Sequence, residues 1–375
     1  MNVLIIGGGI IALTAARELK KRGAERVTIV EKGVLGREAS FAAAGMLAPN
    51  AESNGTGEFH QLCSASNRLF PALAGELLAE TGVNIELDLT GTLFVGFTDE
   101  DEAEIEERYA IQKKAGVNVV PLSGKDVLAL EKNVSGDVRK GLLYPDDGQV
   151  ENRKLVAALR RYAELNDVVI RENTFIDRLV IEDGVVIGAA SGNDVFCADR
   201  VIMATGAWAE LIPNNGQWGA FGPRPIRGQM IGFAAGDFSF SHVIYSPRGY
   251  IVPRADRHVI AGATMEDVGF RAEVTPNGIA AVRKAAEEIA PVLADATMNE
   301  SWAGLRPFVS DGLPVIGEFP GHKNAFIATG HFRNGILLSP ITGRILADLA
   351  TTGKTEIDIT AFSPERFSAA AAGQS

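Results

Sequence analysis

Apolar runs and amphipathic stretches alternate over the first thirty residues. Val3–Ile6 is a short apolar run, typical of a strand buried on both faces. Ile10–Lys21 repeats its apolar residues at near-helical spacing, and Gly23 is suited to end that helix. Arg26–Val30 then forms a second apolar run that ends at Glu31. The pattern predicts a complete βαβ unit with a right-handed parallel crossover.

The rest of the chain divides into further helical and strand-like stretches. Helical patterns occupy residues 59–80, 99–114, 152–165, 275–295 and 336–350. Strand patterns occupy residues 85–97, 168–170, 179–205, 223–264 and 326–330, with a hairpin signal at Asp183-Gly184. Residues 32–49 are rich in Gly and Ala and show no clear secondary structure. Parallel-type units at both ends flank a β-rich middle, which predicts an α/β domain built from separated segments with a second domain inserted.

Composition narrows the possible classes of function. The net charge of −11 argues against nucleic acid as a partner, because phosphates would repel the chain. Two cysteines, Cys63 and Cys197, cannot build a disulfide scaffold or a Cys-rich metal site, so we expect a reducing, cytoplasmic compartment. No apolar run is long enough to span a bilayer, and the N-terminus lacks the basic start of a signal peptide. The 41 glycines among 375 residues exceed the usual share of about 7% and indicate many tight turns or close approaches.

Two of these glycines are signature positions of a dinucleotide-binding pattern. Gly7, Gly9 and Ala12 satisfy Gly-x-Gly-x-x-Gly/Ala between the first strand and its helix, where free backbone amides attract an anion. Glu31 ends the second strand, where a carboxylate accepts hydrogen bonds from ribose hydroxyls and disfavours a 2′-phosphate. The motif favours FAD or NAD over NADP. A glycine-rich turn without a ligand remains the alternative reading.

Two further segments bear on the choice between FAD and NAD. Residues 32–49 would suit a segment that runs along the far end of a long cofactor, although a small-residue packing loop gives the same composition. The buried strand before Thr205-Gly206 ends where a second segment would pass beside a bound cofactor. Both segments are compatible with FAD, and NAD stays open on these residues alone.

With these segments in view, the chain resembles the D-amino-acid oxidase superfamily of FAD-dependent oxidoreductases, and within it the glycine oxidases of the thiamine pathway. The resemblance covers nearly the whole chain. Its most specific segments are Ala42–Leu47, Asp311–Gly317 and Gly330–Pro340. The other matching segments are residues 7–12, 31–32, 204–208, 249–254, 262–265 and 302–307.

The resemblance implies a Rossmann-like FAD-binding domain built from discontinuous segments and an inserted substrate domain based on a mainly antiparallel sheet. We expect residues 1–85, 144–219 and 305–363 to form the first domain and residues 86–143 and 220–304 to form the second, followed by a C-terminal tail, 364–375. A homotetramer is also implied by the resemblance.

The resemblance further assigns residues to the cofactor, which we expect to be held non-covalently because neither cysteine lies near the attachment regions of covalent relatives. The diphosphate would lie over Ile10 and Ile11, the ribose at Glu31 and Lys32, and the adenine near Ile176. The remaining cofactor residues are Gly7, Gly9, Ala12, Ala39, Ser40, Ala44, Gly45, Met46, His331, Phe332, Arg333, Asn334, Gly335, Ile336 and Leu337, with Met265 beside the flavin. We expect no metal, because His331 has no second ligand at zinc-type spacing.

Substrate binding is assigned to three residues. Arg306 matches the carboxylate clamp of the family, a task that suits the planar fork of an arginine. Tyr250 would donate its hydroxyl to the same carboxylate, and Arg333 is the third candidate. Each residue has an alternative role. Arg306 would be an ordinary surface arginine, Tyr250 a core tyrosine and Arg333 a residue that steadies the loop. Arg248 stands at a position that varies in the family and would alter the size or polarity of the pocket.

The implied activity is oxidation of glycine, sarcosine and small D-amino acids by hydride transfer to the flavin, with O2 as the second substrate. Hydrogen peroxide, glyoxylate and ammonia would be the products from glycine, and the imine would serve thiazole synthesis. No residue acts as a general base if the amine binds neutral. Two alternatives stay open: a dehydrogenase or demethylase that passes electrons to another acceptor, and a non-catalytic FAD-binding subunit.

Overall fold

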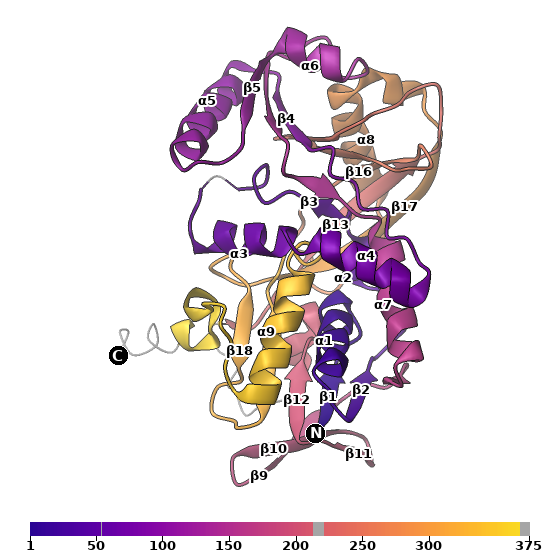
Figure 1. The fold of residues 1–375 in the computed structure, drawn as a ribbon. Helices are drawn as coiled ribbons and strands as arrows, with labels where there is room; N and C mark the ends of the chain where they lie inside the picture. Colours follow the sequence, from indigo (N-terminus) through magenta and orange to yellow (C-terminus); the bar gives the residue numbers. More distant parts are fainter. Residues whose placement is uncertain (54, 213–220, 368–375) are drawn as a thin grey trace.

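Two large β-sheets dominate the molecule. A computed structural model of the chain describes residues 1–53, 55–212 and 221–367. The six-stranded sheet lies in the lower half of Figure 1 and the eight-stranded sheet in the upper half. Each sheet takes strands from distant parts of the sequence. The predicted α/β class, with an antiparallel-rich sheet inserted between parallel units, is confirmed.

The six-stranded sheet contains the predicted N-terminal βαβ unit. Strands β1 and β2 pair in parallel from Asn2↔Arg26 to Ile6↔Val30. The order is β18-β19-β12-β1-β2-β8, and only the edge pair β18–β19 is antiparallel. The strands are β1 (Asn2–Ile6), β2 (Arg26–Val30), β8 (Val169–Arg171), β12 (Arg200–Met203), β18 (Val315–Glu318) and β19 (Ala325–Thr329).

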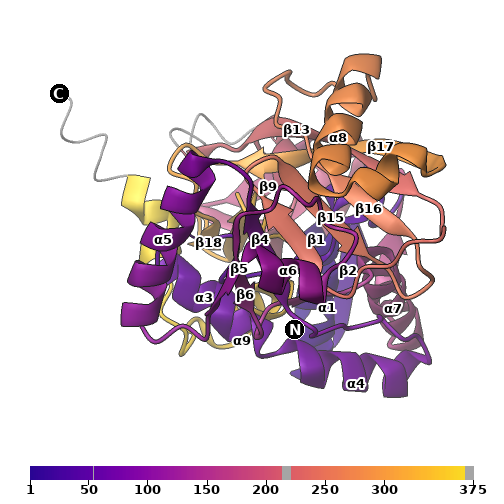
Figure 2. The same cartoon turned by 90° about the horizontal axis from the view of Figure 1, so that it is seen from above.

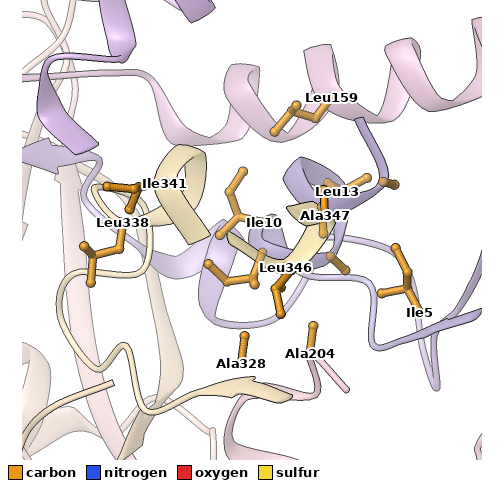
Figure 3. Packing of buried hydrophobic residues seen from close by; sticks show 14 of the residues in the cluster. Ile5, Ile10, Leu13, Leu159, Ala204, Ala328, Leu338, Ile341, Leu346 and Ala347 are labelled. Carbon is orange, nitrogen blue, oxygen red and sulfur yellow. The ribbon is translucent and has the colours of Figure 1, made fainter. Parts of the chain in front are cut away.

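Both faces of this sheet are buried, which explains the continuous apolar run of β1. Val3 and Ile5 belong to one core cluster, and Leu4 and Ile6 to a second cluster on the opposite face. The first cluster is covered by α1 (Ile10–Lys21), α3 (Glu58–Asn67), α4 (Phe70–Thr81), α7 (Asn152–Leu165) and α9 (Ser339–Thr352). Figure 3 shows its close packing, with side chains of α1 beside those of α9.

A small three-stranded sheet packs on the second face. It consists of β9 (Arg178–Glu182), β10 (Val185–Ser191) and β11 (Asp194–Cys197). The predicted hairpin is confirmed: Glu182 pairs with Val185, and Gly184 adopts the left-handed conformation that the turn requires.

The eight-stranded sheet has the order β17-β13-β16-β15-β14-β4-β6-β5, and only β14–β4 is parallel. Its strands are β4 (Thr92–Gly96), β5 (Val120–Ser123), β6 (Lys140–Tyr144), β13 (Arg224–Phe233), β14 (Val243–Ser246), β15 (Gly249–Pro253), β16 (Val259–Gly262) and β17 (Met298–Phe308). Helices α5 (Asp99–Lys114), α6 (Gly124–Leu130) and α8 (Pro276–Ile289) surround it, as Figure 2 shows from above.

The two faces of this second sheet have different neighbours. Ile251 of β15 packs in a cluster with α6 and α8. Tyr250 and Val252 belong instead to a cluster that includes Ala42 and Ala44. These two alanines lie in the segment that follows β2 of the six-stranded sheet. The period-two alternation of β15 therefore turns Tyr250 toward the other half of the molecule.

Four predicted elements differ from the structure. The strand pattern over residues 85–97 forms a strand, β4, only from Thr92 to Gly96. The single helix expected over residues 59–80 is two helices, α3 and α4, separated at Arg68-Leu69 with Pro71 in the first turn of α4. Residues 32–49 are not without secondary structure: they contain the short helix α2 (Ala39–Ala42) and the strand β3 (Met46–Leu47), which pairs with β7 (Gly148–Gln149). The pattern over residues 275–295 is α8 followed by a 3-10 turn, η3 (Pro291–Asp295).

The remaining 3-10 turns are η1 (Gly206–Leu211), η4 (Thr360–Phe362) and η5 (Pro364–Phe367). The start of the expected tail is packed, because Arg366 pairs with Asp311 at 2.7 Å. Residues 213–219 of the expected first domain and residues 368–375 of the expected tail lie outside the described residues. The expected domain boundary between residues 304 and 305 falls inside β17.

Candidate functional site

One cavity of about 310 Å³ runs between the two halves of the molecule. Its walls come from the turn between β1 and α1, the end of β2, the segment 38–46, the start of η1, strands β13, β15 and β17, and the loop 328–336. All the residues that the sequence assigns to cofactor or substrate line this cavity, with three exceptions: Ala12, Asn334 and Leu337. The structure thus brings together candidates that are more than 300 positions apart in the sequence.

The glycine turn at one end of the cavity leaves no room for a side chain at Gly7. Gly7 has φ of +99°, and a Cβ there would lie 2.4 Å from the carbonyl oxygen of Ala204. Helix α1 starts directly after the turn, and the Ile10 amide donates to the Ser40 hydroxyl at 2.9 Å. The Ile11 amide has no acceptor within the described part of the chain. This helix N-terminus therefore offers backbone donors to an anion.

Glu31 lies at the end of β2 beside the glycine turn. Its two carboxylate oxygens accept hydrogen bonds from the amides of Gly8, at 2.7 Å, and Gly33, at 2.8 Å. The residue is buried, but each oxygen still has a free lone pair for a hydroxyl donor. Lys32 pairs with Glu38 at 2.8 Å and lies over the Trp208 ring at 4.0 Å. The carboxylate is therefore better placed than the ammonium group to bind a ribose.

The other end of the cavity contains Arg306 and Tyr250, on the inward faces of β17 and β15. Arg306 donates through Nη1 to the carbonyl oxygen of Thr264 at 3.1 Å. Among the described residues, no carboxylate lies within 4.0 Å of its guanidinium group. Burial raises the pKa of Tyr250, whereas the nearby Arg306 and Arg333 act in the opposite direction. The site thus combines a protonated phenol with an arginine that has no counter-ion in the described part of the chain.

Arg333 differs from Arg306 because it already has an acidic partner. Its Nε lies 3.2 Å from Oε2 of Glu52, and its Nη2 donates to the Tyr245 hydroxyl at 3.0 Å. The charge of Glu52 is the main reason that the pKa of Arg333 is raised. Arg333 is therefore arranged to hold the wall of the cavity, and its charge is largely balanced.

Glu52 and Tyr245 also line the cavity and were missed in the sequence. Tyr245 pairs directly with Tyr250 across β14 and β15, so the hairpin pattern over residues 243–253 was a signal for it. Glu52 follows the Ala42–Leu47 segment closely, but nothing in the sequence connects it with Arg333.

Arg248, which was expected to alter the pocket, lines the cavity while its charge is bound elsewhere. Its guanidinium group pairs with Asp101 of α5 at 3.1 Å and with Glu288 of α8 at 3.2 Å, and it lies over the Phe97 ring. Met265 lines the cavity as well and is 65% exposed.

His331 is buried in the loop after β19. Its Nε2 lies 3.1 Å from the hydroxyl of Thr342, and burial lowers its pKa to about 4. The ring is therefore neutral near pH 7.

The described ranges contain no group of three or more His, Cys, Asp or Glu side chains that could hold a metal ion. No helix within those ranges has the length and apolar character needed to cross a membrane.

Comparison with known proteins identifies the family of the chain. Residues 2–349 match the model of the family described as FAD dependent oxidoreductase. The chain is 34% identical over 369 residues to the glycine oxidase of Geobacillus kaustophilus (strain HTA426). The matched region covers 97% of this chain and 97% of that protein. It is 36% identical over 373 residues to the bifunctional protein ThiO/ThiG of Synechocystis sp., covering 98% of this chain but 54% of that protein. The chain therefore spans about half the length of such bifunctional relatives.

Solved structures agree with the sequence comparisons. The crystal structure of glycine oxidase from Geobacillus kaustophilus superposes with a TM-score of 0.91 at 32% identity, covering 96% of this chain and 97% of that one. Iminodiacetate oxidase (IdaA) from Chelativorans sp. BNC1 gives a TM-score of 0.84 at 29% identity, covering 97% and 99%. The glycine cradle, the helix N-terminus and Glu31 fit the cofactor of this family. The chain belongs to the FAD-dependent oxidoreductase family, as the sequence predicted, and is similar over almost its whole length to glycine oxidases.

Proposed function

We propose that the protein is a FAD-dependent amino-acid oxidase for glycine and similarly small amino acids, including sarcosine and small D-amino acids. With glycine, O2 and water would yield glyoxylate, ammonia and hydrogen peroxide. Arg306 is the observation on which the proposal depends. A guanidinium group without a described acidic partner, facing a cavity beside Tyr250, is suited to bind a substrate carboxylate.

The cofactor would occupy the part of the cavity between the glycine turn and the loop 328–336. When bound, FAD would accept the hydride from the α-carbon of the substrate. Glu31 would accept the ribose hydroxyls, and the amides at the start of α1 would bind the diphosphate. Non-covalent binding is supported by the cysteines: Cys63 and Cys197 both lie outside the cavity lining.

The substrate would be oriented by its carboxylate. Arg306 would form paired, charge-assisted hydrogen bonds with it, and Tyr250 would donate a third. The apolar side chains of Met46 and Met230 line the same cavity and limit the space left for a substrate side chain. This arrangement orients the α-carbon without requiring a protein base, provided that the amine binds neutral.

Two measurements on the purified, FAD-loaded protein test the proposal. In aerated buffer, glycine should produce hydrogen peroxide in step with glyoxylate. Under anaerobic conditions glycine, sarcosine and D-alanine should each bleach the flavin absorbance. Bleaching without peroxide in air would show a dehydrogenase that uses another acceptor. No bleaching by any of the three would refute amino-acid oxidation.

The wider setting is part of the same proposal. Similarity to ThiO/ThiG proteins supports a role in forming the imine for thiazole synthesis, and rescue of a thiamine-requiring glycine oxidase mutant by the intact chain would test it. We also propose a cytoplasmic homotetramer, which light scattering and cell fractionation would check.

A further inference from the structure

Arg254, the residue after β15, is partly buried and has no acidic partner among the described residues. Its Nη1 donates to Oε1 of Gln149 at 2.8 Å and to the carbonyl oxygen of Val150 at 3.0 Å. Its Nη2 donates to the carbonyl oxygen of Ala44 at 2.7 Å and to Oδ1 of Asn152 at 3.2 Å. Within the described ranges, no carboxylate lies within 4.0 Å, and burial lowers the pKa of the residue. Placing a cation among neutral acceptors only is costly.

The contact with Ala44 is one of several that bind the carbonyl oxygens of the segment 40–45. Asn152, at the start of α7, donates to Ser40 and Phe41. Among the carbonyls of this segment, all except that of Ala43 have a donor from outside it. The donors are Asn152 Nδ2 for Ser40 and Phe41, Trp302 Nε1 for Ala42, Arg254 Nη2 for Ala44 and the Val150 amide for Gly45.

Unlike most of its carbonyl oxygens, three amide groups of the same segment lack hydrogen-bond partners among the described residues. Ala43, Ala44 and Gly45 line the cavity, and their N–H groups have no acceptor among the described residues. With the carbonyls bound on the outer side, these amides are left as donors for a ligand in the cavity. The segment lies close against Val150, since a Cβ at Gly45 would be 2.0 Å from the Val150 carbonyl oxygen.

Arg254 also connects this segment with the substrate end of the cavity. It directly follows β15, the strand on which Tyr250 faces the cavity. The Gln149 side chain extends the connection, because it accepts from Arg254 and donates to the carbonyl oxygen of Pro253 at 2.6 Å. One guanidinium group thus fastens the strand of Tyr250 to the segment that lines the cofactor part of the cavity.

We propose that Arg254 is a positioning residue that fixes the segment 43–45 so that its amides bind FAD, and that keeps this segment in register with Tyr250. The inference rests on the proposed function in one respect, namely that FAD occupies this cavity. Arg254 does not line the cavity and would contact neither FAD nor the substrate. It acts through Ala44 and through β15.

The test compares Arg254→Met with Arg254→Lys and with Arg283→Met. Arg283 on α8 is the matched control, because it donates to the carbonyl oxygen of Ala294 at 2.8 Å and lies outside the cavity lining. The measured quantities are the Kd of FAD, from quenching of flavin fluorescence on adding apoprotein, and hydrogen exchange of the peptide that covers residues 40–46. We expect Arg254→Met to raise the Kd at least tenfold and to speed the exchange, Arg254→Lys to have an intermediate effect, and Arg283→Met to match the wild type.

A Kd within twofold of wild type for both folded Arg254 variants would overturn the proposal. If Arg254→Met does not fold, Arg254→Lys alone decides between these outcomes. A wild type that binds FAD but does not oxidise amino acids would refute the proposed function and leave this inference intact. With FAD at saturation, the KM for glycine should rise in Arg254→Met while kcat changes less, because Tyr250 is displaced and the cofactor is still present.

Discussion

The guanidinium group of Arg306 occupies the space that a side chain at Gly228 would take. Gly228 lies on β13 opposite Gly304 of β17, two residues from Arg306, and a Cβ at Gly228 would lie 2.2 Å from Nη2 of Arg306. The absence of a side chain on one strand therefore sets where the arginine of the next strand can lie.

Gly228→Ala should displace Arg306 without removing it. A misplacement of about 1 Å is costly for an oriented substrate, so we expect the KM for glycine to rise on the order of tenfold with FAD content unchanged. Gly232→Ala is the matched control on the same strand, because its new Cβ would meet the side chain of the partly exposed Glu300. The measurement is the KM for glycine of both variants from steady-state kinetics. Equal KM values would show that the guanidinium group adapts freely.

Arg306→Ala removes the proposed carboxylate clamp. Hydrogen bonds to a charged group contribute about 1.5–3 kcal/mol each, so losing two should lower kcat/KM by roughly 10²–10⁴-fold. FAD content, measured from the flavin absorbance, should stay the same. Arg224→Ala on β13 removes an exposed arginine that pairs with Asp267 and should have little effect. Near-normal turnover in Arg306→Ala would rule out the clamp.

Glu52→Gln should make the cavity more attractive to anions. The change keeps the size of the side chain but leaves Arg333 without its counter-charge. A partly exposed ion pair contributes about 1 kcal/mol, so an anionic inhibitor such as glycolate should bind roughly fivefold more tightly. Inhibition constants provide the measurement. Glu38→Gln removes a carboxylate that pairs with Lys32 on the same cavity and serves as the control. Weaker inhibition in Glu52→Gln would contradict the prediction.

Protonation of His331 should destabilise the fold at low pH. Burial lowers its pKa to about 4, below the usual value near 6.5, so between these pH values the unfolded chain takes up a proton that the folded chain does not. The stability contributed by this residue is complete above about pH 6.5 and is lost as the pH falls toward 4, by about 3 kcal/mol in all. Denaturant unfolding of wild type and His331→Asn at several pH values tests this. Parallel pH profiles of the two proteins would show that His331 does not titrate in this way.

The local parts of the fold and site were predictable from the sequence. Gly7, Gly9 and Glu31 belong to one βαβ unit, whose apolar pattern and glycine spacing are read within thirty residues. The break between α3 and α4 was missed because the apolar pattern continues through Arg68-Leu69, although Pro71 in the first turn of α4 is a sequence signal for a new helix start.

Pairings between distant segments could not be predicted. Glu52 meets Arg333 across 281 positions of sequence, and Arg248 is held by Asp101 and Glu288, one on each side of it along the chain. Neither arginine differs in its sequence surroundings from a surface residue. Only the folded arrangement separates Arg306, which lacks a described acidic partner, from the two arginines whose charges are balanced.

The long pairing of β13 with β17 makes the site sensitive to strand register. The two strands pair from Arg224↔Phe308 to Phe233↔Met298, and Trp302, Gly304 and Arg306 alternate onto the face that meets the cofactor half of the molecule. Since successive side chains point to opposite faces, a single-residue insertion before Arg306 would turn its guanidinium group to the side of α8. The molecule would keep its cofactor half and lose the proposed carboxylate clamp, so the placement of this arginine depends as much on the length of a strand as on the identity of the residue.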